Sequence, residues 1–285
     1  MKIFIMTDLE GSSGINGRTD SPVGNQIINQ AIAVKMLTEE INACAEGLVR
    51  AGAEEIVVWD GHGNSNNIEP GSLHPAVSLG TIGGPLMQVN WLDAGYDAAV
   101  QLGTHAMQGT PEAYLSHTFD SHSIAAMWLN GEPIGEIGIV VLLAAYFRVP
   151  TILVSGDQAA CNEAATYNCG QVKTVVTKAA ISRYTVINRN PTAVRQMLTE
   201  KAEQALKNIR KFPVIEMPAS FELKYQFMCP NLADDFEKHG AERLDYQTII
   251  LRSNDFMDLF AQMHGWMPGL HNKKYGITRD YNKNT

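Results

Sequence analysis

The sequence predicts an α/β protein with a central, mainly parallel sheet flanked by helices and a smaller α+β part at the C-terminus. Three observations predict this class. Apolar runs of strand length alternate with stretches in which apolar residues recur at helical spacing. Several of the strands end in small and polar residues, which is typical of parallel sheets that carry a site at their carboxyl ends. After residue 170 the strand segments change to an antiparallel type.

The first part of the chain contains four predicted buried strands and two predicted helices. Residues 25–52 carry apolar residues at helical spacing, and Gly52 is expected to end this helix. The apolar run 137–147 is broken by Gly138 and is shorter than the roughly 18 residues of a membrane span, so it predicts a buried helix. The four strands are expected at residues 2–7, 54–60, 98–105 and 151–157.

The second part begins with a strand at 171–177 and an amphipathic helix at 190–209. Asn190 is the expected N-cap of this helix and Pro191 its first residue. Two antiparallel strands and a closing helix are then predicted at 221–227, 246–253 and 257–267. We expect an α/β domain of residues 1–170 and a smaller α+β lobe of residues 171–285, packed as one unit with it.

Composition excludes some kinds of partner. The chain has 285 residues, of which 45% are hydrophobic, and a formal net charge of −8. An acidic chain is a poor partner for nucleic acid or for an anionic membrane, so neither is expected. The N-terminal apolar run is too short for a signal peptide, and the four cysteines form no CxxC pair. They are interpreted as reduced thiols of a cytoplasmic protein.

Two carboxylates follow the first strand. Asp8 and Glu10 are separated by one residue, and alternate residues of a strand point to the same face. The two side chains are therefore expected to lie close together. Such a pair is unfavourable unless a cation lies between the two groups or one of them keeps its proton.

Further side chains that bind metals lie after the other strands and before the buried helix. Carboxylates and imidazoles that gather at one edge of a sheet suit zinc or a neighbouring metal. A catalytic zinc typically takes three protein ligands and water, so five ligands suit two ions with a bridging carboxylate. Asp8, closest to the loop, is the predicted bridge. The full set of predicted metal ligands is Asp8, Glu10, His62, His105 and Glu136.

Each of these residues also has a purely structural interpretation. The Asp8 and Glu10 pair fits a turn, and His62 follows an ordinary Asp-Gly turn signal. His105 fits a hydrogen-bonded core histidine, and Glu136 fits an acid at a helix N-terminus. Their coincidence at the ends of predicted elements favours the metal site.

At these motifs the sequence resembles the zinc-dependent D-aminopeptidases of the DppA type, peptidase family M55. The resemblance is carried by TDLEGSSGI, DGHGNSNNI, LGTHAM, LSHTF and NGEPIGEIG, in the family's order and near its spacing. It continues through VSGDQAACNEA and TKAAISR. This chain departs from the family pattern at Gly61, where serine is common, and by one extra residue between His105 and His117.

The resemblance implies two zinc ions per chain, bridged by Asp8, and His117 as the catalytic residue. It also implies a homo-oligomer, which is ring-like in the family. The remaining ligands are paired by the resemblance as Glu10 with His105 on one ion and His62 with Glu136 on the other.

The predicted function is that of a binuclear zinc aminopeptidase, which removes N-terminal, D-configured residues from short peptides or amides with a metal-activated water. An unligated His117 suits proton donation to the leaving amine or stabilisation of the oxyanion. Asp60 and Asp157 are further candidates for holding the substrate's α-ammonium group. Asp60 alternatively orients a ligand imidazole.

Two other functions remain open at this point. The first is a related metal-dependent amidohydrolase or a phosphoesterase that uses the same zinc pair. Phosphoesterases usually add Arg or Lys to hold the phosphate, and near these motifs only Arg18, Lys178 and Arg183 offer such a group. The second is a non-catalytic metal- or ligand-binding protein.

Overall fold

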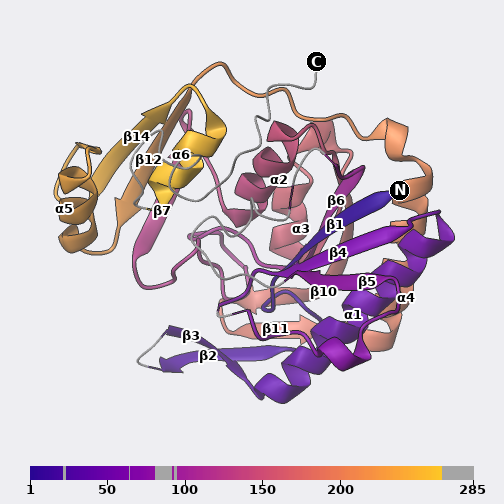
Figure 1. The fold of residues 1–285 in the computed structure, drawn as a ribbon. Helices are drawn as coiled ribbons and strands as arrows, with labels where there is room; N and C mark the ends of the chain where they lie inside the picture. The colour runs from indigo at the N-terminus through magenta and orange to yellow at the C-terminus, as the bar shows by residue number, and fades with distance from the viewer. Residues whose placement is uncertain (22–23, 64, 81–91, 93–94, 265–285) are drawn as a thin grey trace.

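A seven-stranded sheet forms the centre of the molecule (Figure 1). The computed structural model describes residues 1–21, 24–63, 65–80, 92 and 95–264. All neighbouring strands of this sheet run parallel except the last pair, β10 and β11. The predicted α/β class with a mainly parallel sheet is confirmed. In spatial order the strands are β11 (Thr185–Asn188), β10 (Lys173–Ser182), β9 (Thr151–Asp157), β6 (Ala98–Thr104), β1 (Lys2–Thr7), β4 (Glu55–Asp60) and β5 (Val77–Gly80).

Helices cover both faces of this sheet. Side chains alternate along β1, so Ile3 and Ile5 pack into one core with α1 (Gln30–Arg50) and α4 (Pro191–Lys207). Phe4 and Met6 point to the opposite face, into the core that contains α2 (Glu136–Tyr146). Figure 1 shows α3 (Gln158–Ala164) beside α2. The buried helix predicted at residues 137–147 is α2.

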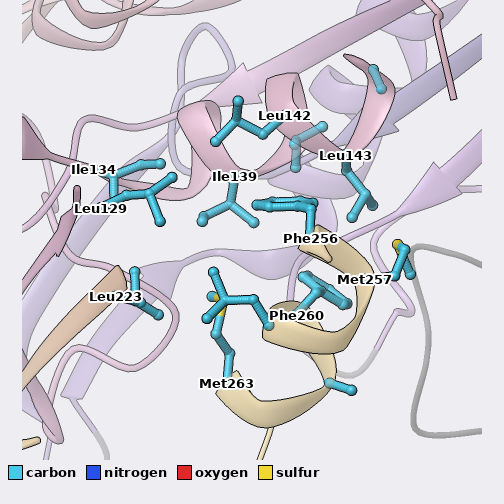
Figure 2. Packing of buried hydrophobic residues seen from close by; sticks show 14 of the residues in the cluster. Leu129, Ile134, Ile139, Leu142, Leu143, Leu223, Phe256, Met257, Phe260 and Met263 are labelled. Atoms are coloured by element: carbon cyan, nitrogen blue, oxygen red, sulfur yellow. The ribbon is translucent and has the colours of Figure 1, made fainter. Parts of the chain in front are cut away.

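A smaller antiparallel sheet packs against the far side of α2. Its strands lie in the order β13-β14-β12-β7-β8, and α5 (Pro230–Lys238) and α6 (Phe256–Met263) accompany it. Figure 2 shows Ile139 and Leu143 of α2 facing the Phe256 and Phe260 rings of α6. The strands are β7 (Ile124–Leu129), β8 (Glu132–Pro133), β12 (Phe221–Phe227), β13 (Glu242–Arg243) and β14 (Thr248–Ser253).

Both sheets contain strands from either side of residue 170. β10 and β11 follow that position and complete the large sheet next to β9. β7 and β8 precede it and join the small sheet, where Leu129 lies opposite Leu223 of β12. The division into a domain of residues 1–170 and a lobe of residues 171–285 stays a prediction.

The helix predicted at residues 25–52 begins later than expected. Residues Gly24–Ile28 form β3, which pairs with β2 (Asn16–Ser21) as an antiparallel ribbon. Asn29 then takes a left-handed conformation, with φ of 62°, and α1 starts at the next residue. The other end agrees with the sequence, because Gly52 has φ of 95° and its N–H bonds to the Val49 carbonyl.

The N-cap of the second long helix is as predicted. The Asn190 side-chain oxygen accepts hydrogen bonds from the backbone N–H groups of Thr192 and Ala193, at 2.9 and 3.3 Å. The closing helix, expected at residues 257–267, is α6, and the last of those residues lie outside the described part of the chain.

Two further observations concern the cysteines and the predicted lack of a membrane span. Cys44, Cys161 and Cys229 are free thiols. Among the residues that the structure describes, no helix combines the length and the apolar character needed to cross a membrane.

Candidate metal centre

The carboxyl ends of three adjacent strands bring the predicted ligands together. β1 lies between β4 and β6, and Thr7 at its end is level with Asp60 and with Leu102. Asp8 and Glu10 therefore lie between the residues that follow β4 and β6, which are His62 and His105. Glu136 reaches the same place as the first residue of α2.

A tight turn, and not continuation of the strand, aligns the two carboxylates of the first motif. β1 ends at Thr7, and the Ser12 N–H closes a turn onto the Leu9 carbonyl at 3.1 Å. The Gly11 N–H donates to the Gly103 carbonyl at 2.8 Å. A Cβ atom on Gly11 would lie 1.9 Å from the Thr104 carbonyl oxygen, so only glycine permits this close crossing over β6.

Asp8, Glu10 and His62 form the first group of possible ligands. The Nδ1 atom of His62 lies 3.0 Å from Asp8 Oδ1 and 2.9 Å from Glu10 Oε2. Although it is this near, Glu10 Oε2 is buried and accepts no hydrogen bond of acceptable geometry. Burial lowers the pKa of His62, but the charges of Glu10 and Asp8 outweigh it and raise the pKa to about 11. The two carboxylates therefore favour a positive charge beside them, and a metal ion bound by the three side chains would supply it.

Asp8, His105 and Glu136 form the second group. His105 Nε2 lies 3.2 Å from Asp8 Oδ2 and 3.4 Å from Glu136 Oε1. The other ring nitrogen, Nδ1, lies 3.0 Å from the Ala106 carbonyl, which can only accept, so Nδ1 carries the hydrogen and Nε2 faces the acids. Burial raises the pKa of Asp8, but His105 and His62 outweigh it and hold that pKa well below its usual value. Asp8 thus turns one oxygen to each group.

His117 lies beside both groups. Its ring stacks on the His105 ring with centroids 3.9 Å apart and planes 15° apart. Its Nδ1 donates to the Leu115 carbonyl at 2.8 Å, and its Nε2 lies 4.0 Å from Glu136 Oε1. Ligand atoms of His117, His105 and Glu10 also come within 4.8 Å of one another. The geometry therefore allows His117 either to act on a substrate or to bind metal.

Asp60 and Asp157 are occupied by donors of their own chain. Asp60 accepts from the backbone N–H groups of Asn67 at 2.6 Å and His62 at 3.2 Å. The two oxygens of Asp157 accept from the N–H groups of Ala160 and Tyr114, both at 2.8 Å. These bonds fix the loop that carries His62 and the start of α3, and none of them reaches a histidine ring.

The sequence predicts no role in the metal centre for two buried ionisable residues next to it, Lys178 and Glu163. Lys178 on β10 is fully buried, and burial lowers its pKa to about 7 against the opposing charges of Glu40, Asp157 and Glu10. Glu163 on α3 is 8% exposed. Lys178 lies in TKAAISR and Glu163 in VSGDQAACNEA. Both segments are part of the family resemblance, and this is the sequence feature from which the two residues could have been found.

Glu163 supports the segments that follow His105 and precede Glu136. Its Oε2 accepts from the Met107 N–H at 2.8 Å. Its Oε1 has no hydrogen-bond partner and lies 2.9 Å from the position of a Cβ atom on Gly135. Burial raises the pKa of Glu163 to about 7, against the opposing effect of the Met107 N–H.

Replacement of this carboxyl group by an amide is expected to stabilise the metal-free protein at high pH. Because the pKa of Glu163 is raised in the folded state, the folded protein binds this proton more tightly than the unfolded chain. The contribution of this tighter proton binding to the free energy of unfolding is complete below about pH 4.5 and is lost as the pH rises through about 7. Glu163→Gln should therefore exceed the wild type by less than about 1 kcal/mol near pH 5 and by up to about 3 kcal/mol at pH 8. Urea unfolding with a chelator present measures both values.

Glu200→Gln on the exposed face of α4 is the matched control, since it removes the same charge from a solvated position. An equal stability difference at pH 5 and pH 8 for Glu163→Gln would contradict the raised pKa.

A mainly parallel sheet that presents carboxylates and imidazoles at its carboxyl edge, in two groups joined by one aspartate, defines a metal-dependent hydrolase. The chain belongs to peptidase family M55, whose profile, described as D-aminopeptidase, matches residues 1–264. The resemblance drawn from the motifs is thereby confirmed.

Two relatives agree with this family. A D-aminopeptidase of Bacillus subtilis (strain 168) is 33% identical over 230 residues, which are 80% of this chain and 81% of that protein. A solved structure, described as the Zn-dependent D-aminopeptidase DppA from Bacillus subtilis, a self-compartmentalizing protease, is also similar. It matches with a TM-score of 0.84 and 30% identity, over 92% of this chain and 95% of the other.

Proposed function

We propose that the protein is a binuclear zinc aminopeptidase that releases N-terminal D-amino acid residues from short peptides or amides. One observation carries the proposal. Asp8 turns Oδ1 toward His62 and Oδ2 toward His105, and each histidine also faces a second carboxylate. A carboxylate shared in this way suits a hydrolase in which two metal ions lie close together. Membership of the M55 family supports the activity.

The distances favour a pairing of ligands that differs from the one the resemblance implies. Glu10 lies 2.9 Å from His62, and Glu136 lies 3.4 Å from His105. Glu10 also shares a group with His105 and His117, whereas His62 and Glu136 share no group. We therefore propose that one ion takes Asp8, Glu10 and His62 and the other takes Asp8, His105 and Glu136. Glu10 Oε2, which lies 2.9 Å from His62 Nδ1 without forming a hydrogen bond, supports this, because ligands that converge on an ion need not hydrogen-bond to one another.

The zinc ions and His117 have different roles in the proposed hydrolysis. Zinc ions, when bound, supply Lewis acidity and lower the pKa of water toward about 7. His117 keeps its Nδ1 hydrogen on the Leu115 carbonyl, so its Nε2 is the atom that takes up a proton and passes it to the leaving amine.

We also propose that the protein acts as a homo-oligomer in the cytoplasm. The related DppA structure is described as a self-compartmentalizing protease, which is a property of an assembly. Reduced cysteines support the cytoplasm. Size-exclusion chromatography with light scattering measures the assembly, and a monomer at working concentration would contradict it.

The activity is tested by zinc content and by hydrolysis of D-Ala and L-Ala p-nitroanilides. We expect two zinc ions per chain, faster release of p-nitroaniline from the D substrate, loss of activity after chelation and recovery when zinc is restored. p-Nitrophenyl phosphate serves as the control substrate. Hydrolysis of the phosphate in preference to both anilides would support a phosphoesterase instead, and bound zinc without hydrolysis of any of the three would support a binding protein.

A further inference from the structure

A fully buried lysine touches the turn that carries Glu10. Lys178 lies on β10, and its Nζ donates to the backbone carbonyls of Glu10 at 2.7 Å and of Ile15 at 3.1 Å. The same atom lies 4.6 Å from the centre of the Tyr114 ring. A lysine ammonium is rarely buried completely, because removal from water is costly unless its donors are used. Here its hydrogen bonds go to the two ends of one short segment, residues 10–15.

The same segment is held at several other points. The Thr177 hydroxyl, next to Lys178, donates to the Gly11 carbonyl and lies 3.0 Å from the Gly156 carbonyl. Glu40 of α1 accepts from the Ser13 N–H at 2.7 Å. None of these contacts uses the Glu10 carboxylate, which is left to point at His62.

We propose that Lys178 is a positioning residue of the metal centre. Its ammonium group binds the carbonyls at both ends of residues 10–15 and thereby fixes the Glu10 carboxylate opposite Asp8 and His62. The inference rests on the proposed function, since it assigns Glu10 to one of two zinc ions. It predicts an effect on that ion in particular, because Lys178 makes no contact with His105 or Glu136 in the described hydrogen bonds.

The direct test is the zinc affinity of Lys178→Met, measured on the folded protein by competition with a chelator of known affinity. Methionine keeps the length of the buried side chain but donates no hydrogen bond, so the Glu10 and Ile15 carbonyls lose their partner. We expect the zinc ion held by Asp8, Glu10 and His62 to lose roughly 10–100-fold in affinity, which is typical when a group that orients a metal ligand is removed. The second ion should stay within about twofold of the wild type.

Two further variants complete the experiment. Lys173→Met changes an exposed lysine of the same strand and should bind both ions as the wild type does. Thr177→Val removes a neutral hydrogen bond to the same segment. It should weaken the same ion less and, if Lys178→Met does not fold, it takes over the test. Hydrogen exchange of residues 11–15 in the metal-free protein gives a second readout, and it should speed up in both variants but not in Lys173→Met.

The outcomes separate this inference from the proposed function. Selective weakening of one ion with faster exchange supports Lys178 as a positioning residue. Unchanged affinity for both ions, or an equal loss for both, overturns it while leaving the zinc enzyme intact. A wild-type protein that binds no zinc overturns the proposed function itself.

Discussion

Asp8→Ala is expected to abolish hydrolysis and to release bound zinc in the same step. Asp8 offers one oxygen to the group of His62 and the other to the group of His105, so its removal leaves each group with two possible ligands. Zinc in a catalytic site usually needs three protein ligands, and neither remaining pair meets that number while His117 stays unligated, as proposed. Activity should fall below detection. The fold should persist, because the backbone of residue 8 keeps its bond to the Leu102 carbonyl.

Elemental analysis, D-Ala p-nitroanilide hydrolysis and circular dichroism on one preparation measure the three quantities. Asp235→Ala, which removes an exposed acid from α5, is the control for the change in net charge. An Asp8→Ala protein that still holds two zinc ions per chain would rule out Asp8 as the bridge.

His117→Ala is expected to keep zinc and to lose roughly 10²–10⁴-fold in kcat, which is the usual contribution of a general acid or base. The reason is its position. Nδ1 of His117 is held by the Leu115 carbonyl, its ring stacks on His105, and its Nε2 lies 4.0 Å from Glu136 Oε1, farther than the contacts of His62 and His105 with their carboxylates. A group so placed can hand over a proton without being needed to hold a metal.

His122→Ala is the matched control, since His122 follows in the same loop and its side chain is 52% exposed. It should retain full activity. Zinc content and kcat from the same preparation distinguish the possible roles of His117. Loss of zinc together with activity would make His117 a ligand, as its distance from Glu10 and His105 permits. Retention of both zinc and activity would show that His117 has no role in metal binding or in the reaction.

The large sheet could be predicted because its signals are local. Buried strands such as β1 and β9 are continuous apolar runs with clear ends, and the residues that follow adjacent parallel strands must meet at one edge. That rule placed His62 and His105 together without any knowledge of distances. The sequence pattern predicted the wrong element where the pairing of a strand with its neighbour decides the structure. Gly24–Ile28 continues the apolar spacing of α1, yet it forms β3 because β2 lies opposite.

The supporting residues of the site could not be predicted for a related reason. Nothing local marks Lys178 as buried, because its partners are carbonyls of residues 10 and 15 that reach it only through the tertiary fold. Asp157 shows the converse. It is the last residue of the buried strand β9, much as Asp8 comes directly after β1, but its oxygens accept from the N–H groups of Ala160 in α3 and of Tyr114. The sequence does not distinguish an acid that faces the site from one that caps a helix.

The small sheet joins strands that lie far apart in the sequence, and this has a consequence for the order of folding. β7, which leads through β8 to Glu136, pairs with β12, so Leu129 meets Leu223 only after a long intervening stretch has been made. Contacts between such distant residues slow folding, because a long loop must close before they form. On the ribosome, β7 has no β12 to pair with until the C-terminal part emerges. The chain therefore completes its small sheet late in synthesis, and the start of α2 gains its full support only then.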